Sequence, residues 1–411
     1  MMALMPIDEA LRQLLAQATT RGVETLPTEE ALGRVLAHDV LAPKAYPFED
    51  NSAMDGYAVL AGNGPWHVVG ESAAGAPYEG SINADQAVRI FTGGVVPKGA
   101  NTILIQENCE RDGELLKTDQ PLKADRHIRR LGSDFEAGAH LIDQGVSLRG
   151  SDLSALVGLG LSEVTCHRRP RVAIFSTGDE VVPLGSKRQI GQVYDSNALF
   201  LRHAALQSGA DIIKVGHLAD DRAQVDQALR HVIDHADLVL LSGGVSVGDH
   251  DHIGSALSDL CGGLTFYKVC MKPGKPVAAA KVGDCTLLGL PGNPASTMVS
   301  FELFARPMIK ALSGAANPHR TLRLARGLTP LKAAGTRVEF LRARLCAEGL
   351  IAKARQGSGD LSSLLTVDAL IYRPANAAET SAGELQPYLA LEGPDCGTAP
   401  EAQWDHLKSQ V

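Results

Sequence analysis

The sequence predicts a multidomain protein of mixed α/β and β structure, built around a central, doubly wound and mostly parallel α/β domain. Three observations lead to this prediction. The chain has 411 residues, more than one domain of ordinary size. From Arg171 onward, short apolar runs alternate with helical patterns, as they do where helices join parallel strands. On both sides of that region, short strands and glycine-rich turns replace this rhythm.

These changes of pattern predict four parts. They are an elongated N-terminal α+β linker domain (residues 1–47 plus 139–168), a β-rich second domain (48–138), the α/β domain (169–312) and a C-terminal β domain (319–411). The pairing of the first two segments is an expectation that the sequence alone does not prove.

The composition excludes several classes of function. With a formal net charge of −8, the chain lacks the basic face of a general nucleic-acid binder. No apolar run approaches the length that spans a membrane. The seven cysteines are odd in number and show no C-x-x-C spacing, which favours reduced thiols over disulfides or structural zinc. We therefore expect a cytoplasmic protein with no nucleic-acid or membrane partner.

The N-terminal region and the second domain are expected to contain short elements. Helical spacing predicts a helix over 7–18, and a second one over 28–36 with Thr28 as its N-cap. Two prolines bound an extended connector, 43–47. The later elements are strands at 86–91, 102–106 and 139–142, a helix opening at Ser151 or Asp152, and a strand at 162–166.

In the α/β domain the expected elements follow one another closely. The strands are 172–176, 211–216, 238–241, 264–269 and 286–290, and the helices are 198–207, 222–235 and 295–312. Pro294 suits the first turn of the last helix, and Pro307 should bend it. Beyond a linker at 313–319 we expect mainly strands, with a frayed tail from about Gly393.

The strongest functional signal lies between Asp237 and Asp251. An apolar strand, Leu238–Leu241, runs directly into a loop that contains three glycines and two serines. Glycines leave backbone amides accessible to an oxyanion, and ligands of open parallel sheets bind at the carboxyl ends of the strands. A plain strand-to-helix turn would also contain glycines, so both interpretations of this loop stay open.

The other loops at this edge of the sheet collect charged residues. They are Asp179, Glu180, Asp220, Asp221, Asp249, Asp251, Lys268, Lys272 and Lys275. Mg²⁺ binds carboxylates together with phosphate oxygens, while lysines and helix N-termini hold the anion, so the set favours a magnesium-assisted phosphate reaction. Singly, each acid could equally be a solvated loop residue or a helix cap, as Asp221 illustrates. The segment Asp249–His252 could hold a transition metal, although adjacent positions rarely converge on one ion.

Seven motifs resemble those of the molybdopterin molybdenumtransferases, a family that includes the E domain of gephyrin. They are Asn51-Ser-Ala-Met-Asp-Gly-Tyr57, Arg89-Ile-Phe-Thr-Gly93, Ile128-Arg-Arg-x-Gly-x-Asp134, Ser176-Thr-Gly-Asp-Glu180, Ser242-Gly-Gly-Val-Ser-Val-Gly248, Lys272-Pro-Gly-Lys-Pro276 and Leu290-Pro-Gly-Asn-Pro294. The resemblance covers nearly the whole chain in order, including Gly357-Ser-Gly and Leu361-Ser-Ser363.

The resemblance implies an elongated homodimer whose active cleft lies between the α/β domain of one subunit and the second domain of the other. The implied reaction inserts molybdenum from molybdate into adenylylated molybdopterin, with Mg²⁺ or another divalent cation, and releases AMP. Transient contacts with the adenylyltransferase and with acceptors of the cofactor are also implied.

The resemblance implies site residues at the positions of this sequence that match the family motifs. The implied catalytic residues are Asp55, Thr92, Asp134, Glu180, Asp251, Lys268 and Lys272. The implied substrate-binding residues are Arg129, Thr177, Gly178, Ser242, Gly243, Gly244, Ser246, Lys275, Pro291, Gly292, Asn293 and Pro294. The implied metal ligands are Glu180, Asp220 and Asp251.

Two departures and two alternatives accompany this interpretation. After Thr92-Gly93 the family usually continues with Ala-Pro, whereas this chain has Gly94-Val95, and the histidines at 250 and 252 are unusual. The related molybdopterin adenylyltransferase is one alternative, although that activity needs only one α/β domain. A non-catalytic scaffold of the same fold is the other, and the full set of acids and lysines argues against it.

Overall fold

The computed structural model describes residues 4–244, 263–392, 395–396 and 399–409. The chain forms two compact units, which are treated separately. The first comprises residues 1–38, 144–150 and 163–411, and the second comprises 39–143 and 151–162. Among the described residues, every helix is too short or too polar to cross a membrane.

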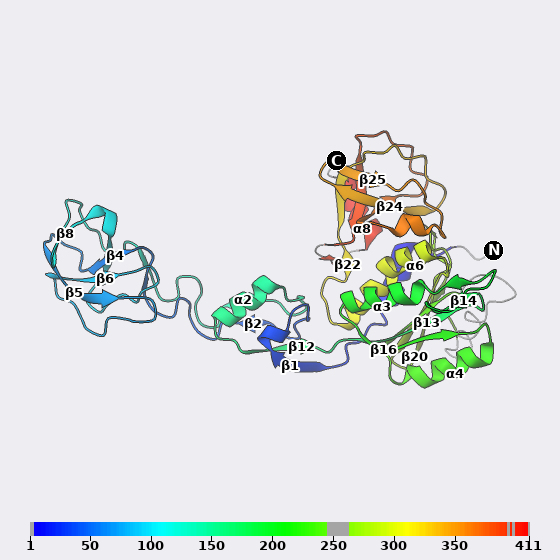
Figure 1. Cartoon of the computed structure of the whole chain (residues 1–411), viewed down its shortest axis with the longest axis horizontal. Coiled ribbons are helices and arrows are strands. Elements are labelled where there is room, and N and C mark those ends of the chain that lie inside the picture. The colour runs from blue at the N-terminus through cyan, green and yellow to red at the C-terminus, as the bar shows by residue number, and fades with distance from the viewer. Residues whose placement is uncertain (1–3, 245–262, 393–394, 397–398, 410–411) are drawn as a thin grey trace. The chain divides into compact units, whose positions relative to one another are not determined.

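The first unit is built on a six-stranded sheet in the order β16-β13-β17-β21-β20-β18 (Figure 1). Its strands are β13 (Arg171–Thr177), β16 (Asp211–Leu218), β17 (Leu238–Ser242), β18 (Phe266–Tyr267), β20 (Ala278–Val282) and β21 (Cys285–Leu290). The first four strands of that order run parallel, and their carboxyl ends therefore meet at one edge. A two-stranded parallel ribbon, β14 (Val181–Val182) with β15 (Val193–Tyr194), follows β13.

Alternation along the central strands explains why helices cover both faces of this sheet. Val172 and Ile174 of β13 belong to one buried cluster, and Ala173 and Phe175 belong to another. The first cluster packs against α1 (Ile7–Leu15), α3 (Asn197–Gln207), α6 (Pro294–Ser300) and α7 (Arg306–Leu312), and the second against α4 (Arg222–Ile233). Figure 1 shows α3 and α6 on one side of the strands and α4 on the other. The predicted doubly wound fold is confirmed.

Local details differ from the expectation in two places. The segment expected as a strand over 264–269 forms a strand only at Phe266–Tyr267, which runs antiparallel to β20, a strand that the sequence analysis did not assign. The helix expected over 295–312 contains one π turn, η3 (Phe301–Ala305), which ends two residues before Pro307. Because proline has no N–H to donate to the preceding turn, a wider turn is one way in which a helix continues past it.

The C-terminal part of this unit is a second sheet, in the order β19-β24-β26-β27-β23, with β25 paired to β24. Its strands are β19 (Met271–Lys272), β23 (Leu322–Arg326), β24 (Val338–Cys346), β25 (Gly349–Ala352), β26 (Ala369–Arg373) and β27 (Leu385–Ala390), with the turn η4 (Leu361–Leu364). A short pair, β22 (His319–Arg320) with β28 (Asp395–Cys396), completes it. Since β19 comes from the α/β region, the two parts share a sheet.

The expected frayed tail is wrong for residues 400–408, which form α8 (Pro400–Lys408). Proline suits the first turn of a helix, and the carboxylate of Asp8 accepts hydrogen bonds from the amides of Glu401 (3.4 Å) and Ala402 (3.1 Å). The ring of Trp404 also lies 6.1 Å from that of Tyr372. These contacts bind the tail to α1 and to the C-terminal sheet.

The N-terminal helix therefore lies in the α/β core, a contact that the expected division into domains does not anticipate. The division itself stays a prediction. The second expected helix, over 28–36, is wrong except for one turn, η1 (Thr28–Glu30), and Thr28 is not its cap, since the turn is preceded by Pro27. The chain turns at Gly33 (φ +72°), and nearby β1 (Val23–Pro27) pairs with β12 (Glu163–His167).

The second unit is built on a six-stranded sheet in the order β7-β4-β6-β5-β9-β8. Its elements are β2 (Val40–Leu41), β3 (Asn51–Ser52), β4 (Gly56–Val59), β5 (Trp66–Ser72), β6 (Gln86–Ile90), β7 (Thr102–Ile105), η2 (Gln106–Asn108), β8 (Glu110–Asp112), β9 (Leu115–Lys117), β10 (Ile128–Arg129), β11 (His140–Ile142) and α2 (Gly150–Gly158). Trp66 and Leu116 are fully buried in its core. Two strand pairs, β3 with β10 and β2 with β11, connect this sheet to the rest of the unit.

One buried histidine predicts how acid affects the stability of the first unit. Burial lowers the pKa of His319 from 6.5 to about 4, and the effect of Arg306 in the same direction is opposed by Asp395. As the pH falls below 6.5, His319 binds a proton in the unfolded chain but stays neutral in the folded chain. The free energy of unfolding therefore decreases on acidification. Between about pH 8 and about pH 5 this amounts to roughly 2 kcal/mol.

We expect His319→Gln to lose correspondingly less free energy of unfolding than the unmodified chain over this interval, measured by urea denaturation. The exposed His231 on α4 provides the control, His231→Gln, which should follow the unmodified chain. Equal pH dependence of all three proteins would contradict the prediction.

Candidate functional site

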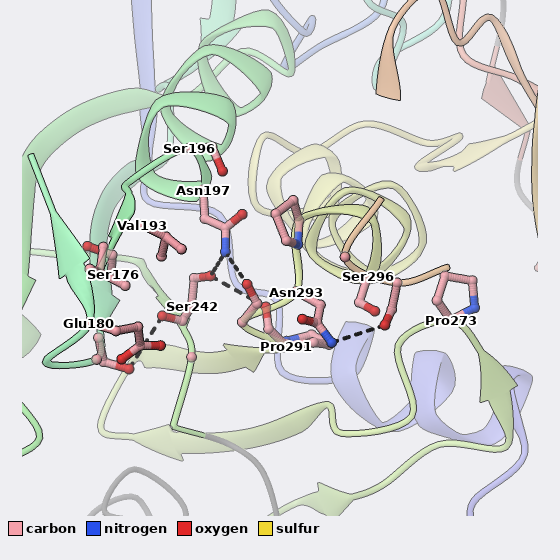
Figure 2. Close-up of a pocket in the computed structure, with 18 of the residues that line it drawn as sticks. Ser176, Glu180, Val193, Ser196, Asn197, Ser242, Pro273, Pro291, Asn293 and Ser296 are labelled. Carbon is pink, nitrogen blue, oxygen red and sulfur yellow. Dashed lines mark hydrogen bonds between the residues drawn. The ribbon is translucent and has the colours of Figure 1, made fainter. Parts of the chain in front are cut away.

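A pocket of the first unit lies at the carboxyl ends of β13, β17 and β21 and has a volume of about 1200 Å³. Residues from three loops at these strand ends, from the turn after β19 and from the C-terminal region line it. They include Thr177, Gly178, Glu180, Asp195, Asn197, Asp220, Ser242, Gly243, Gly244, Lys272, Lys275, Pro291, Gly292, Asn293, Pro294, Arg337 and Ser358. In the view of Figure 2, Glu180 and Ser176 lie at one end and Pro273 and Ser296 at the other, with Ser242 and Pro291 between them.

Close approach of two loops explains the glycine that follows β17. Gly243 has φ +100°, and a Cβ atom placed on it would lie 2.7 Å from the hydroxyl and 2.8 Å from the carbonyl oxygen of Thr177. Only glycine adopts this conformation without strain and leaves space for Thr177. Gly243 and Gly244, the described residues of this loop, line the pocket beside Thr177.

A side chain that the sequence analysis missed connects the three loops. The amide nitrogen of Asn197, at the start of α3, donates to the hydroxyl of Ser242 (2.9 Å) and to the carbonyl oxygen of Gly292 (2.7 Å) (Figure 2). The hydroxyl of Thr297 donates to the carbonyl oxygen of Pro291 (2.6 Å). Asn197 follows β15, a strand of only two residues that the sequence analysis did not assign, which is why the pattern gave no signal for it.

Asp195 is a second pocket residue that the sequence analysis did not select. Its carboxylate accepts hydrogen bonds from the hydroxyl of Ser176 (2.5 Å) and from the amide of Ala198 (2.9 Å) at the start of α3. Ser176 is buried at the end of β13 and also lies 3.2 Å from a ring nitrogen of His217. This network fixes the end of β13 relative to α3.

The C-terminal region contributes to the pocket through the loop Gln356–Leu361. The side-chain amide of Asn293 donates to the hydroxyl of Ser358 (3.0 Å), and the amide of Ala295 donates to the carbonyl oxygen of Ser358 (3.0 Å). The fully buried Arg342 of β24 donates to the carbonyl oxygen of Gly357 (2.9 Å). These bonds fix the loop against the first turn of α6.

The structure brings together only part of the expected charged set. Glu180, Asp220, Lys272 and Lys275 line the pocket, whereas Lys268 is not among the lining residues and its ammonium lies 4.5 Å from the ring centre of Tyr267. Asp221 caps α4, as the alternative interpretation holds: its carboxylate accepts from two amides of the first turn. Asp179 accepts from the amide of Asp220 (3.1 Å). Ser246, Asp249 and Asp251, with the proposed transition-metal segment, lie outside the described residues.

The second unit holds the other four expected residues. The carboxylate of Asp55 accepts hydrogen bonds from the backbone amide (2.7 Å) and the hydroxyl (2.8 Å) of Thr92. These bonds hold the pKa of Asp55 below its ordinary value, and the nearby Arg89 cation adds to the effect. Arg129 and Asp134 form an exposed ion pair of 3.4 Å.

Three family models match the chain in order. They are described as MoeA N-terminal region (domain I and II), over residues 5–160, probable molybdopterin binding domain, over 173–311, and MoeA C-terminal region (domain IV), over 325–391. A molybdopterin molybdenumtransferase of Haemophilus influenzae is 37% identical over 318 residues, 76% of this chain and 78% of the relative. Molybdopterin molybdenumtransferase 2 of Mycobacterium tuberculosis is 35% identical over 376 residues, 87% of this chain and 93% of the relative.

The chain belongs to the molybdopterin molybdenumtransferase family. It is accordingly a transferase of molybdenum cofactor biosynthesis. Its structure is similar to that of a MoeA protein of molybdopterin biosynthesis from Pyrococcus horikoshii, with a TM-score of 0.82 and 27% identity over 94% of this chain and 100% of that one.

The structure explains one departure from the usual family pattern. A Cβ atom on Gly94 would lie 2.6 Å from the carbonyl oxygen of Ser72 and 2.9 Å from that of Phe91. The amide of Gly94 donates to Phe91, and its carbonyl oxygen accepts from Ser52 (2.9 Å), so the backbone is fixed on both sides. An alanine would not fit this turn, and the Asp55–Thr92 contact is present next to it.

Proposed function

We propose that this member of the family inserts molybdenum from molybdate into adenylylated molybdopterin and releases AMP, giving the molybdenum cofactor. One observation carries the proposal: a pocket of about 1200 Å³ combines glycine-rich backbone with two lysines and three carboxylates. That volume exceeds the usual range for a drug-sized ligand and suits a pterin joined to a nucleotide. Exposed amides and lysines bind phosphate and molybdate oxygens.

The residues of the pocket would divide the binding between them. The turns Thr177–Gly178, Ser242–Gly244 and Pro291–Pro294 would hold the adenylylated pterin, and Lys272 and Lys275 would neutralise its phosphates or the incoming molybdate. In the second unit, Asp55, Thr92, Arg129 and Asp134 remain proposed site residues, and so does Lys268. Ser246 and Asp251 stay in the proposed set on the resemblance alone.

A divalent cation such as Mg²⁺ fits the donors present. Glu180 and Asp220 line the same pocket as the two lysines, and Mg²⁺ binds through one or two carboxylates completed by phosphate oxygens and water. When bound, the ion would neutralise charge on the phosphate that joins the pterin to AMP. Asp251 is the third proposed ligand.

Release of AMP tests the proposal directly. The full-length protein, supplied with adenylylated molybdopterin and Mg²⁺, should release AMP in proportion to added molybdate, measured by chromatography. The adenylyltransferase alternative predicts formation of the adduct from ATP and molybdopterin, and the scaffold alternative predicts neither reaction. Absence of molybdate-dependent AMP release would contradict the proposed function.

We further propose a homodimer in which each active cleft combines the α/β domain of one subunit with the second domain of the other. Support comes from the division of the expected residues between two compact units. Asp55→Asn and Glu180→Gln should each abolish most turnover. Differently tagged, purified mixed dimers of the two variants should then recover about half of the normal turnover, because one cleft of each dimer is intact. Mixed dimers as inactive as the parents would contradict the shared cleft.

We place the protein in the cytoplasm, with transient contacts to the adenylyltransferase that supplies its substrate and to acceptors of its product. The described cysteines support a reducing compartment, since Cys109, Cys166, Cys270, Cys285 and Cys346 form no disulfide.

A further inference from the structure

A buried carboxylate that does not line the pocket contacts one of the two lysines that do. The ammonium of Lys272 lies 2.9 Å from Oε1 of Glu339, and it donates a hydrogen bond to that oxygen. The side chain of Lys272 is 56% exposed and that of Glu339 only 11%. The acid is therefore embedded in the protein while the base extends into solvent at the pocket.

The backbone fixes both partners. Lys272 in β19 stands opposite Glu339 in β24 within a parallel strand pair, and Arg337 donates to the carbonyl oxygen of Met271 at 3.0 Å. On its other side, Glu339 stands opposite Arg373 in β26. Both strand neighbours of this carboxylate are thus cations.

The guanidinium of Arg373 donates its hydrogen bonds to other groups, so that Oε1 of Glu339 accepts from Lys272. The guanidinium of Arg373 donates to the carbonyl oxygens of Lys332 (3.1 Å) and Ala378, and the cation is buried. Burial lowers the pKa of Arg373, and the charge of Glu339 opposes that shift. The carboxylate therefore balances a buried cation and orients an exposed one.

We propose that Glu339 is a positioning residue, which holds the ammonium of Lys272 at the pocket so that this cation binds the anionic substrate without first being ordered. This inference rests on the proposed function. A lysine has three N–H donors, so one bond to Glu339 leaves two for oxyanion oxygens. A free lysine side chain would lose conformational freedom when it becomes ordered, and the contact with Glu339 removes part of that loss in advance.

The test compares Glu339→Gln with a matched control elsewhere in the same unit. Glu302 is equally buried, at 11% side-chain exposure, and pairs with Arg320 at 3.0 Å, but it does not line the main pocket. Glu302→Gln thus removes the charge of a carboxylate that is equally buried and also paired with a cation. We expect Glu339→Gln to raise the molybdate concentration for half-maximal AMP release about tenfold, with turnover at saturation within about twofold, as for loss of a charge-assisted contact. Glu302→Gln should leave the molybdate requirement unchanged.

Two further variants test whether Glu339 acts through its charge and through Lys272. Glu339→Asp retains the charge and should restore part of the molybdate affinity, and in a Lys272→Ala background Glu339→Gln should cause no additional loss. Calorimetric titration of the full chain with sodium molybdate provides a readout that does not depend on turnover. Equal molybdate affinity of the two Gln variants, or additive effects of Lys272→Ala and Glu339→Gln, would overturn the inference. Absence of AMP release from the unmodified protein would instead refute the proposed function.

Discussion

Lys272→Ala is expected to raise the molybdate concentration for half-maximal turnover roughly 10- to 100-fold, because one charge-assisted contact contributes about 1.5–3 kcal/mol. The ammonium lies at the pocket, and its partner Glu339 holds it in place. Removing the cation should weaken anion binding more than it slows turnover at saturating molybdate. The measurement is the rate of AMP release as a function of molybdate concentration.

Lys272→Ala also leaves Glu339 without its partner, so the controls must separate a loss of stability from a loss of molybdate binding. A buried carboxylate that loses its cation destabilises the fold, so some loss of thermal stability is expected. The double variant Lys272→Ala/Glu339→Gln should regain stability while keeping the raised molybdate requirement. Lys214→Ala, which removes an exposed lysine from β16, controls for net charge. A normal molybdate requirement in a stably folded Lys272→Ala protein would remove Lys272 from the site.

The parallel sheet and its functional edge were predictable because their signals are local. A run of apolar residues such as Leu238–Leu241 has few alternatives to a buried strand, and the glycines after it mark where the backbone approaches a neighbour. Asp221 shows the limit of the same reasoning. An acid after a strand is equally suited to capping the next helix, and here it does so.

Residues that depend on distant partners gave no such signal. Asn197 donates to Ser242 and Gly292, and Asp195 accepts from Ser176 of β13; the sequence neighbours of these two residues do not indicate those partners. Glu339 contacts Lys272 across 67 positions of the chain, through a strand pair of only two residues. The helix α8 was missed for the same reason, because its first turn is capped by Asp8 from the other end of the chain.

Gly243→Ala is expected to reduce AMP release about 100-fold, since a displacement of about 1 Å at a reacting site can cost that much. Its Cβ atom would lie 2.7 Å and 2.8 Å from two oxygen atoms of Thr177, one of them in the backbone, so one of the two pocket loops must move.

Gly209 offers a matched control: its φ of +98° is nearly the same, but no atom lies within 4 Å of the added Cβ. Gly209→Ala therefore introduces the same backbone strain, about 1 kcal/mol, without contact with the pocket. In urea denaturation Gly243→Ala should lose more stability than Gly209→Ala, because its contacts with Thr177 add to the shared strain, and only Gly243→Ala should lose turnover. Equal turnover of the two proteins would show that the close approach of these loops is not required for the reaction.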